Sequence, residues 1–140
     1  MIRVLVDTNI VISALLFPAS VPAQALALVV DEHVLVLTQW VLDELQRVVG
    51  EKRPDLLSAL DAVLTNIGYE LAEPAETGPV ISDPNDQPIL DAAIAGAVDV
   101  IVTGDKRFHA LDIETPRVLT ARGFLTEFGE RHAGGGAAPC

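Results

Sequence analysis

The stretch Ile2-Arg3-Val4-Leu5-Val6-Asp7-Thr8-Asn9 is a short apolar run that ends in three polar residues. Such a run is typical of a strand that is buried on both faces of a parallel sheet. Similar runs predict a second strand over Val34–Leu37 and a later one over Val98–Val102. Shorter strands are predicted over Tyr69–Leu71 and Arg117–Leu119.

Helical periodicity fills the segments between these runs. It predicts helices over residues 10–16, 22–31, 39–49, 55–66, 86–97 and 120–128, and a loop over 73–85. Pro22 suits the first turn of a helix, and Thr38 and Thr120 can each cap the helix that follows. Strands that alternate with helices imply right-handed crossovers and a mainly parallel sheet covered on both faces. We therefore predict a single α/β domain.

Length and composition agree with one domain. The chain has 140 residues, of which half are apolar, and this excludes a disordered chain. Charges or prolines interrupt every apolar run before the roughly 18 residues of a membrane span, and no secretory signal is visible, so we expect a cytoplasmic protein without a membrane partner. The single cysteine, Cys140, excludes a disulfide framework and a cysteine-based zinc site. Residues 1–130 should form the domain and 131–140 a disordered tail.

The net charge points away from a simple nucleic-acid binder. Nine Lys and Arg against 20 Asp and Glu give a formal charge of −11. Proteins that bind nucleic acids are usually basic, because neutralisation of phosphates drives the affinity. Solubility alone explains an acidic chain, whereas binding a polyanion would require divalent cations or a basic partner.

Two aspartates directly follow predicted strands, Asp7 after the first and Asp105 after Val98–Val102. In open parallel sheets, ligands bind outside the carboxyl ends of the strands. A single aspartate in such a place explains no more than a turn or a helix cap. Two aspartates at equivalent strand ends favour a site.

Two further acids lie on predicted helices. Glu44 lies about 40° outside the apolar stripe of its helix and can reach a site at the border of the core, whereas Asp43 points away. An ion pair with Arg47 explains Glu44 slightly better by periodicity alone. Asp86 precedes Pro88 and suits the N-cap or first turn of its helix, which does not preclude metal binding. Asp91 lies about 60° outside the stripe and ranks below Asp86.

Convergence of these carboxylates would require cations, because crowded negative charges repel one another. Mg²⁺ or Mn²⁺ suits a site made of oxygen ligands. One ion, or two ions about 3.5–4 Å apart, would activate water and stabilise the leaving oxygen of a phosphodiester. Without metal, Asp7→Asn or Asp105→Asn should relieve the repulsion and raise the melting temperature.

Four segments together resemble PIN-domain ribonucleases, especially the toxin components of bacterial toxin–antitoxin pairs. The first is Val4–Leu16, which begins Val4-Leu5-Val6-Asp7-Thr8-Asn9, and the last is Val100–Phe108, with Thr103-Gly104-Asp105 at its centre. Between them lie Thr38–Leu45 and Asp83–Ala93. The match spans about residues 2–128 and includes a closing strand near Val118. The first and last motifs are specific in combination, whereas the middle two are weak alone.

The resemblance implies a Rossmann-like α/β/α sandwich that hydrolyses RNA without a covalent intermediate. By motif position, the acids that bind Mg²⁺ or Mn²⁺ are Asp7, Glu44, Asp86 and Asp105. The choice between Asp83 and Asp86 stays open, although the spacing of related sequences favours Asp86. The implied partners are an RNA substrate, an antitoxin protein and a second copy of the chain in a homodimer.

Several neighbours of these acids have two interpretations. Asn9 and Thr103 match polar positions that would hold carboxylates by hydrogen bonds, although a turn explains Asn9 equally well. Lys106 and Arg107 follow an acid of the site and would steer phosphate, or they form a solvated helix start. Trp40 is expected to pack and His109 to lie on the surface. The segment Val21–Val30 fits ordinary core better than a partner-binding surface.

Other protein classes also use acidic pockets on α/β sheets. A signalling receiver would carry two acids after the first strand, where this chain has only Asp7. A hydrolase with an aspartate nucleophile would have its second aspartate where Asn9 stands. A non-catalytic or regulatory metal-binding domain would keep the acids without turnover, and this alternative stays open.

Overall fold

Five parallel strands form one sheet in the computed structural model, which describes residues 1–75, 78, 81–84 and 86–129. The strands are β1 (Arg3–Val6), β2 (Val34–Thr38), β3 (Glu70–Ala72), β4 (Val100–Val102) and β5 (Arg117–Leu119). They lie in the order β3-β2-β1-β4-β5, and every neighbouring pair is parallel. The predicted α/β fold is confirmed, with a strand in each of the five predicted places.

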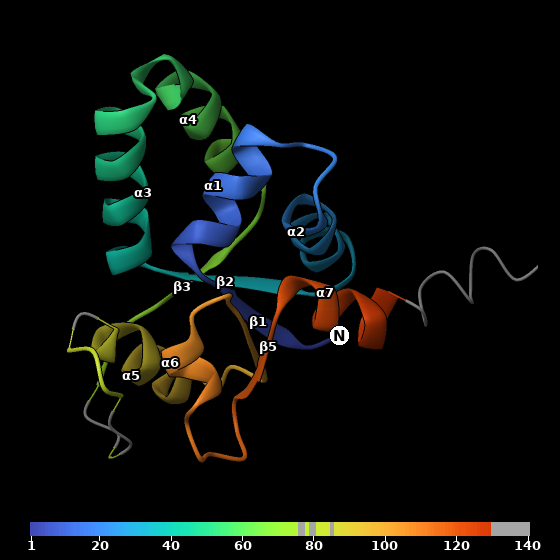
Figure 1. Cartoon of the computed structure of the whole chain (residues 1–140), viewed down its shortest axis with the longest axis vertical. Coiled ribbons are helices and arrows are strands. Elements are labelled where there is room, and N and C mark those ends of the chain that lie inside the picture. Colours follow the sequence, from blue (N-terminus) through green and yellow to red (C-terminus); the bar gives the residue numbers. More distant parts are fainter. Residues whose placement is uncertain (76–77, 79–80, 85, 130–140) are drawn as a thin grey trace, which may run out of the picture.

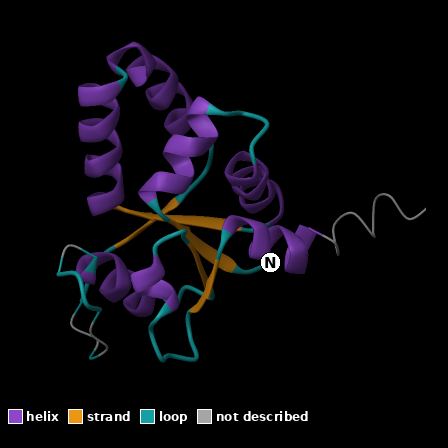
Figure 2. Cartoon of the chain, viewed as in Figure 1, coloured by secondary structure: helices purple, strands orange, loops and turns teal. Residues whose placement is uncertain are grey.

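Helices cover both faces of the sheet. They are α1 (Thr8–Leu16), α2 (Val21–Glu32), α3 (Gln39–Lys52), α4 (Leu57–Asn66), α5 (Gln87–Ala95), α6 (Lys106–His109) and α7 (Ala121–Phe124). The other helical segments are a 3-10 turn, η1 (Pro54–Leu56), and a π-helical turn, η2 (Leu125–Gly129). In Figure 1, α1, α3 and α4 lie on one side of the sheet and α5 and α6 on the other. Figure 2 shows the strands as the layer between them.

Local signals in the sequence set several helix starts. The Thr38 hydroxyl accepts a hydrogen bond from the Val41 amide (3.0 Å), and the Thr120 hydroxyl accepts one from the Gly123 amide (2.9 Å). Both predicted caps are therefore confirmed, and Pro22 lies in the first turn of α2 as predicted. The helix predicted over 55–66 begins instead with the 3-10 turn η1, and the one predicted over 120–128 changes after Phe124 into the π-helical turn η2.

The first strand is the centre of the core. Val4, Leu5 and Val6 are 0%, 0% and 1% exposed, since helices cover both faces of β1 and strands flank both edges. Val4 lies opposite Leu35 of β2 and Val100 of β4. Burial on both faces explains why these strands are continuous apolar runs without polar alternation.

The predicted fourth strand is two residues too long at its start. Val98 and Asp99 precede β4, where the Asp99 amide donates to the Arg3 carbonyl (2.8 Å) and the Asp99 carboxylate accepts from the Arg3 amide (2.8 Å). The Asp99 carboxylate thus accepts the hydrogen bond that a carbonyl of a neighbouring strand would otherwise accept. The regular strand β4 begins only after this residue.

Parts of two predicted segments lie outside the described residues. The predicted loop over 73–85 is described only at 73–75, 78 and 81–84, and the predicted tail 131–140 lies beyond the last described residue. Within the described ranges, no single helix is long and apolar enough to cross a membrane. Helices α1 and α2 reach that length and apolar character only when taken together, and they are bent by 109° relative to each other.

Helix α5 ends before Gly96, a position with little room for a side chain. A Cβ atom at Gly96 would lie 2.9 Å from the Ala92 carbonyl oxygen and 3.3 Å from the Ala72 Cβ. The next residue, Ala97, has a φ of 54°, in the left-handed region that side chains disfavour. The helix predicted to reach Ala97 therefore stops at Ala95, where the chain turns toward β4.

Exchanging the two residue types at this turn should have opposite effects on stability. Gly96→Ala should lower the free energy of unfolding by about 1–2 kcal/mol, because the new Cβ overlaps backbone. Ala97→Gly should raise it by about 0.5–1 kcal/mol, because the left-handed conformation costs glycine little. Urea denaturation of both variants measures the effects, and a Gly96→Ala protein as stable as the wild type would contradict the close approach.

Candidate metal centre

The strand order reverses at β1, which has β2 on one side and β4 on the other. Ligands of doubly wound sheets bind at the carboxyl ends of the strands where the order reverses. Val6 pairs with Val102, so the residues that follow β1 and β4 emerge side by side. Asp7 and Asp105 are thereby brought to one edge of the sheet, as their positions after strands predict.

The hydroxyl of Thr103 links these two aspartates. It donates a hydrogen bond to Asp7 Oδ2 (2.7 Å) and accepts one from the Asp105 amide (3.0 Å). The Asp7 amide also donates to the Val102 carbonyl (3.1 Å), which extends the ladder between β1 and β4 past the strand end. Thr103 is fully buried, so this link is shielded from water.

Burial raises the pKa of Asp7 above its ordinary value. Hydrogen bonds from the Thr103 hydroxyl and the Thr8 amide oppose this rise, whereas the charges of Glu44 and Asp105 add to it. Glu44 lies on α3, which begins where β2 ends, beside β1. A carboxylate in such surroundings is stabilised in its charged form by a nearby cation.

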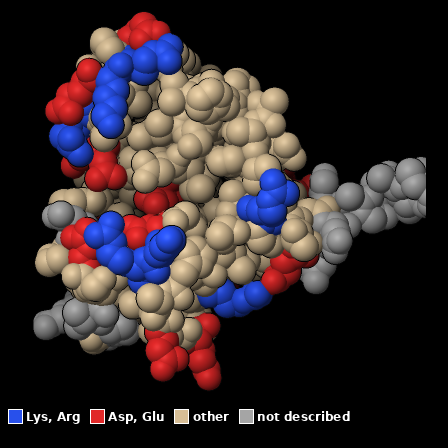
Figure 3. Space-filling model, in the orientation of Figure 1, with Lys and Arg blue, Asp and Glu red and all other residues tan. Residues whose placement is uncertain are grey.

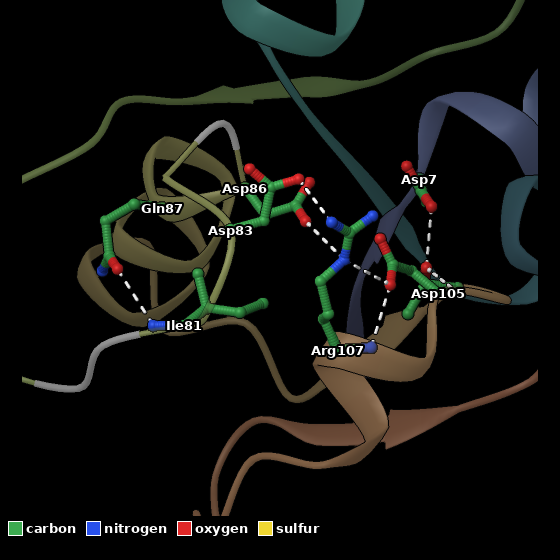
Figure 4. Close-up of polar contacts among 8 residues, drawn as sticks. Asp7, Ile81, Asp83, Asp86, Gln87, Asp105 and Arg107 are labelled. Carbon is green, nitrogen blue, oxygen red and sulfur yellow. Dashed lines mark hydrogen bonds and ion pairs between the residues drawn. The ribbon is translucent and has the colours of Figure 1, made fainter.

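A cation from the chain itself already lies among the acids (Figure 4). Arg107 Nη1 is 2.6 Å from Asp83 Oδ2, and Arg107 Nε is 3.2 Å from Asp105 Oδ1 and 3.7 Å from Asp86 Oδ2. The Arg107 amide donates to Asp105 Oδ1 (2.9 Å), so Asp105 also caps α6. Arg107 thus ties the segment before α5 to the segment after β4.

Asp86 has the most perturbed carboxyl of the group. Burial, together with the charges of Asp105 and Asp83, raises the pKa of Asp86 to about 6, although Arg107 opposes this. Its Oδ2 atom is buried and has no hydrogen-bond partner. Asp86 stands at the N-cap position of α5 as predicted, but its side chain does not cap the helix.

Asp105 differs from Asp7 and Asp86. Desolvation alone would raise its pKa, but hydrogen bonds from the Arg107 amide and guanidinium outweigh it and leave the pKa of Asp105 below its ordinary value. The charged form of Asp105 is therefore stabilised by the fold. The raised pKa of Asp7 favours the expectation that its neutralisation raises the melting temperature, whereas the lowered pKa of Asp105 argues against it there. Both effects stay predictions.

The oxygen donors at this edge fit a hard divalent cation. The clearest sign is the buried Asp86 Oδ2 atom, which accepts no hydrogen bond and has only the 3.7 Å ion pair with Arg107, since a buried carboxylate oxygen is costly unless it is hydrogen-bonded. Among the described residues, no three acidic or imidazole side chains lie close enough together to ligate one ion. Arg107 lies between Asp86 and Asp105. The carboxylates of these two aspartates would therefore have to move closer together to ligate the same ion.

Glu44 and Asn9 form no hydrogen bond or ion pair with these acids among the described residues. The Glu44 side chain is one-third exposed and lies 4.0 Å from Arg47, so the predicted ion pair and the electrostatic effect on Asp7 are both present. Asn9 is exposed on α1, and in the described part of the chain its side chain makes no hydrogen bond. Lys106 is exposed on α6 and forms no ion pair with any described residue.

The acids of the third motif segment, Asp83, Asp86 and Asp91, differ in the side chains that they contact. Asp83 contacts Arg107, whereas Asp91 accepts a hydrogen bond from Gln87 (2.9 Å) one turn along α5. Gln87 in turn accepts from the Ile81 amide (3.0 Å), and Figure 4 shows Gln87 further from Arg107 than Asp83 and Asp86 are. The sequence did not reveal that Arg107 bridges Asp83 and Asp105, because 24 residues separate it from Asp83.

The topology excludes one alternative. A receiver places its third strand beside its first. Here β4 occupies that place, and β3 lies at the edge beyond β2. The chain therefore lacks the receiver arrangement of strands.

Comparison with known proteins gives one family and two similar folds. A family model described as PIN domain matches residues 3–107. VapBC2 from Rickettsia felis bound to a promoter DNA fragment contains a similar chain, with a TM-score of 0.62 and 21% identity over 84% of this chain and 96% of that one. DNA-bound VapBC from Salmonella typhimurium contains another, with a TM-score of 0.63 and 16% identity over 86% and 99%. No curated protein matches the chain.

The pKa of Asp86 makes the stability of the metal-free protein depend on pH. Because the folded pKa of about 6 exceeds the ordinary 3.8, the native state holds the proton more tightly than the unfolded state. Stability from this group is complete below pH 3.8 and is lost as the pH rises through about 6. Asp86→Asn should flatten this decline in urea denaturation with chelator present. The exposed Asp112→Asn is the control, and equal slopes in Asp86→Asn and wild type would refute the assignment.

Proposed function

The chain belongs to the PIN domain family, and we propose that it is a divalent-metal-dependent endoribonuclease, the toxin of a toxin–antitoxin pair. The observation that supports this most directly is the buried Asp86 Oδ2 atom, which accepts no hydrogen bond and has only a 3.7 Å ion pair with Arg107, at the reversal point of the sheet. Asp7 shares the Thr103 hydroxyl with Asp105, and Glu44 adds its charge from α3.

In this proposal Mg²⁺ or Mn²⁺ would be held by four carboxylates, those of Asp7, Glu44, Asp86 and Asp105. When bound, such ions supply an activated water and stabilise the leaving oxygen of the phosphodiester. Thr103 would fix the orientation of Asp7 through its hydrogen bond. Asn9 would order the same edge from the first turn of α1.

Basic side chains next to the acids offset the overall charge. Lys106 and Arg107 both lie on α6, and Figure 3 shows basic side chains over this helix directly beside acidic ones. The ammonium of Lys106 is exposed and unpaired among the described residues. It would attract an RNA phosphate to the site, while Arg107 would balance the carboxylates that the phosphate has to approach.

Cleavage of a mixed structured RNA tests the proposal. With Mn²⁺ or Mg²⁺, Asp86→Asn should lower the rate by more than about 100-fold, because it removes a proposed ligand. Asp83→Asn should retain more activity, because Asp83 pairs with Arg107, and Asp112→Asn should match the wild type. Gel analysis with metal and with chelator measures the rates. Cleavage that persists in chelator, or in Asp86→Asn at the wild-type rate, would refute the mechanism.

A non-catalytic or regulatory metal-binding domain is the second candidate. The observation that favours it is that Arg107 already pairs with the acids, while no ion-sized cluster of three ligands exists among the described residues. Such a domain would bind Mn²⁺ in calorimetry and cleave no RNA. A nuclease would do both, so the same protein preparation separates the two candidates.

We also propose an antitoxin as the partner, since the fold resembles chains found in VapBC complexes. An apolar groove of about 450 Å³ lies between α1, α2 and α4, and its walls include Val11, Leu15, Ala27, Val30 and Val63. An amphipathic helix buries its apolar face in a groove of this kind. The predicted homodimer and cytoplasmic location remain part of the proposal.

Blocking the groove should separate partner binding from catalysis. Ala27 is exposed on α2 and lines the groove, so Ala27→Glu would bury a charge against an apolar partner helix. We expect co-purification with the product of an adjacent small reading frame to be lost, while RNA cleavage is unchanged. Gln24→Glu is the control with the same charge change outside the groove. Undiminished co-purification of Ala27→Glu would place the partner elsewhere.

A further inference from the structure

Trp40 is the only tryptophan of the chain, and its side chain is 40% exposed. The expectation of a packing aromatic is therefore only half met. Trp40 lies in the first turn of α3, where the chain leaves β2 through the Thr38 cap. A large aromatic ring that stays in contact with water at a strand end is available to a ligand.

The exposed ring forms one wall of a pocket of about 380 Å³, the Trp40 pocket, whose other walls are Asp43, Glu44 and Arg47. Trp40 and Glu44 are four residues apart on α3 and so share one face of the helix. Glu44 is also the acid whose charge reaches Asp7. The Trp40 pocket and the proposed set of metal ligands therefore have Glu44 in common.

The chemistry of the walls suits a nucleobase better than a phosphate. Two carboxylates repel phosphate but accept hydrogen bonds from the amino groups of bases. Asp43 is held in place because Gln39 Nε2 donates to its Oδ1 (2.8 Å). Arg47 is 59% exposed and lies 3.6 Å from Glu51 and 4.0 Å from Glu44, so loose ion pairs leave its guanidinium donors accessible at the rim.

We propose that the Trp40 pocket binds one base of single-stranded RNA, which stacks on the indole ring while Asp43 accepts a hydrogen bond from its amino group. Bases are accessible to such stacking only where RNA is unpaired, and aromatic stacking tolerates different bases. The base would anchor the strand that passes the acids at the sheet edge. This inference rests on the proposed ribonuclease function.

The single tryptophan gives a direct test, because all indole fluorescence comes from Trp40. A single-stranded, cytosine-rich RNA of about ten nucleotides, added to the wild-type protein with Ca²⁺, should quench the emission. An abasic strand of the same length carries the same charge and should not. Absence of quenching, or equal quenching by the abasic strand, would overturn the proposal.

Variants identify the ring as the cause. Trp40→Leu should weaken binding of the labelled RNA about tenfold in fluorescence anisotropy, whereas Trp40→Phe keeps a stacking surface and should retain most of the affinity. Phe17→Leu is the control, since Phe17 is 63% exposed at the far end of α1. If Trp40→Leu bound the labelled RNA with wild-type affinity, the proposal would be overturned. This holds whether or not the variant still binds a protein partner.

The experiment also separates this inference from the proposed function. Base-dependent quenching without cleavage in Mn²⁺ would support the Trp40 pocket and reject the nuclease. Metal-dependent cleavage without quenching would support the nuclease and reject the Trp40 pocket.

Discussion

The Thr103 hydroxyl is the contact on which the candidate site depends. It donates to Asp7 and accepts from the Asp105 amide, and so it fixes the residues that follow the two central strands. The contact exists because β1 pairs with β4 at the point where the strand order reverses. Burial of both strands on both faces holds that pairing in register, so the apolar core positions the acids.

Acidic side chains that are buried at one edge of the sheet repel one another and lose hydration, and the fold compensates for this differently at each acid. Burial and neighbouring charges raise the pKa values of Asp7 and Asp86, whereas Arg107 lowers that of Asp105. The guanidinium of Arg107 thus offsets part of the negative charge that a divalent ion would otherwise offset. The formal charge of −11 describes the whole chain, but the local arrangement of Arg107 and the acids decides which ligands can approach.

Helix α1 connects the candidate metal centre with the apolar groove. It begins directly after Asp7 and contributes Val11 and Leu15 to the groove about one and two turns later. Helix α3 begins directly after β2 and carries both Glu44, whose charge acts on Asp7, and the exposed Trp40. Helices α1 and α3, which follow the two neighbouring strands β1 and β2, therefore carry residues of the candidate metal centre, of the groove and of the Trp40 pocket.

The sequence alone determined the five strands, most helix starts and the acids at strand ends, because apolar runs and caps such as Thr38 are local signals. Periodicity also placed Glu44 at the border of the core. Only the tertiary structure decided that β4 lies beside β1, that Arg107 reaches Asp83, and that Trp40 stays exposed. These three features depend on how segments distant in the sequence pack against each other. Local periodicity predicts which side of its own helix a side chain lies on, but it does not identify the residues that the side chain contacts.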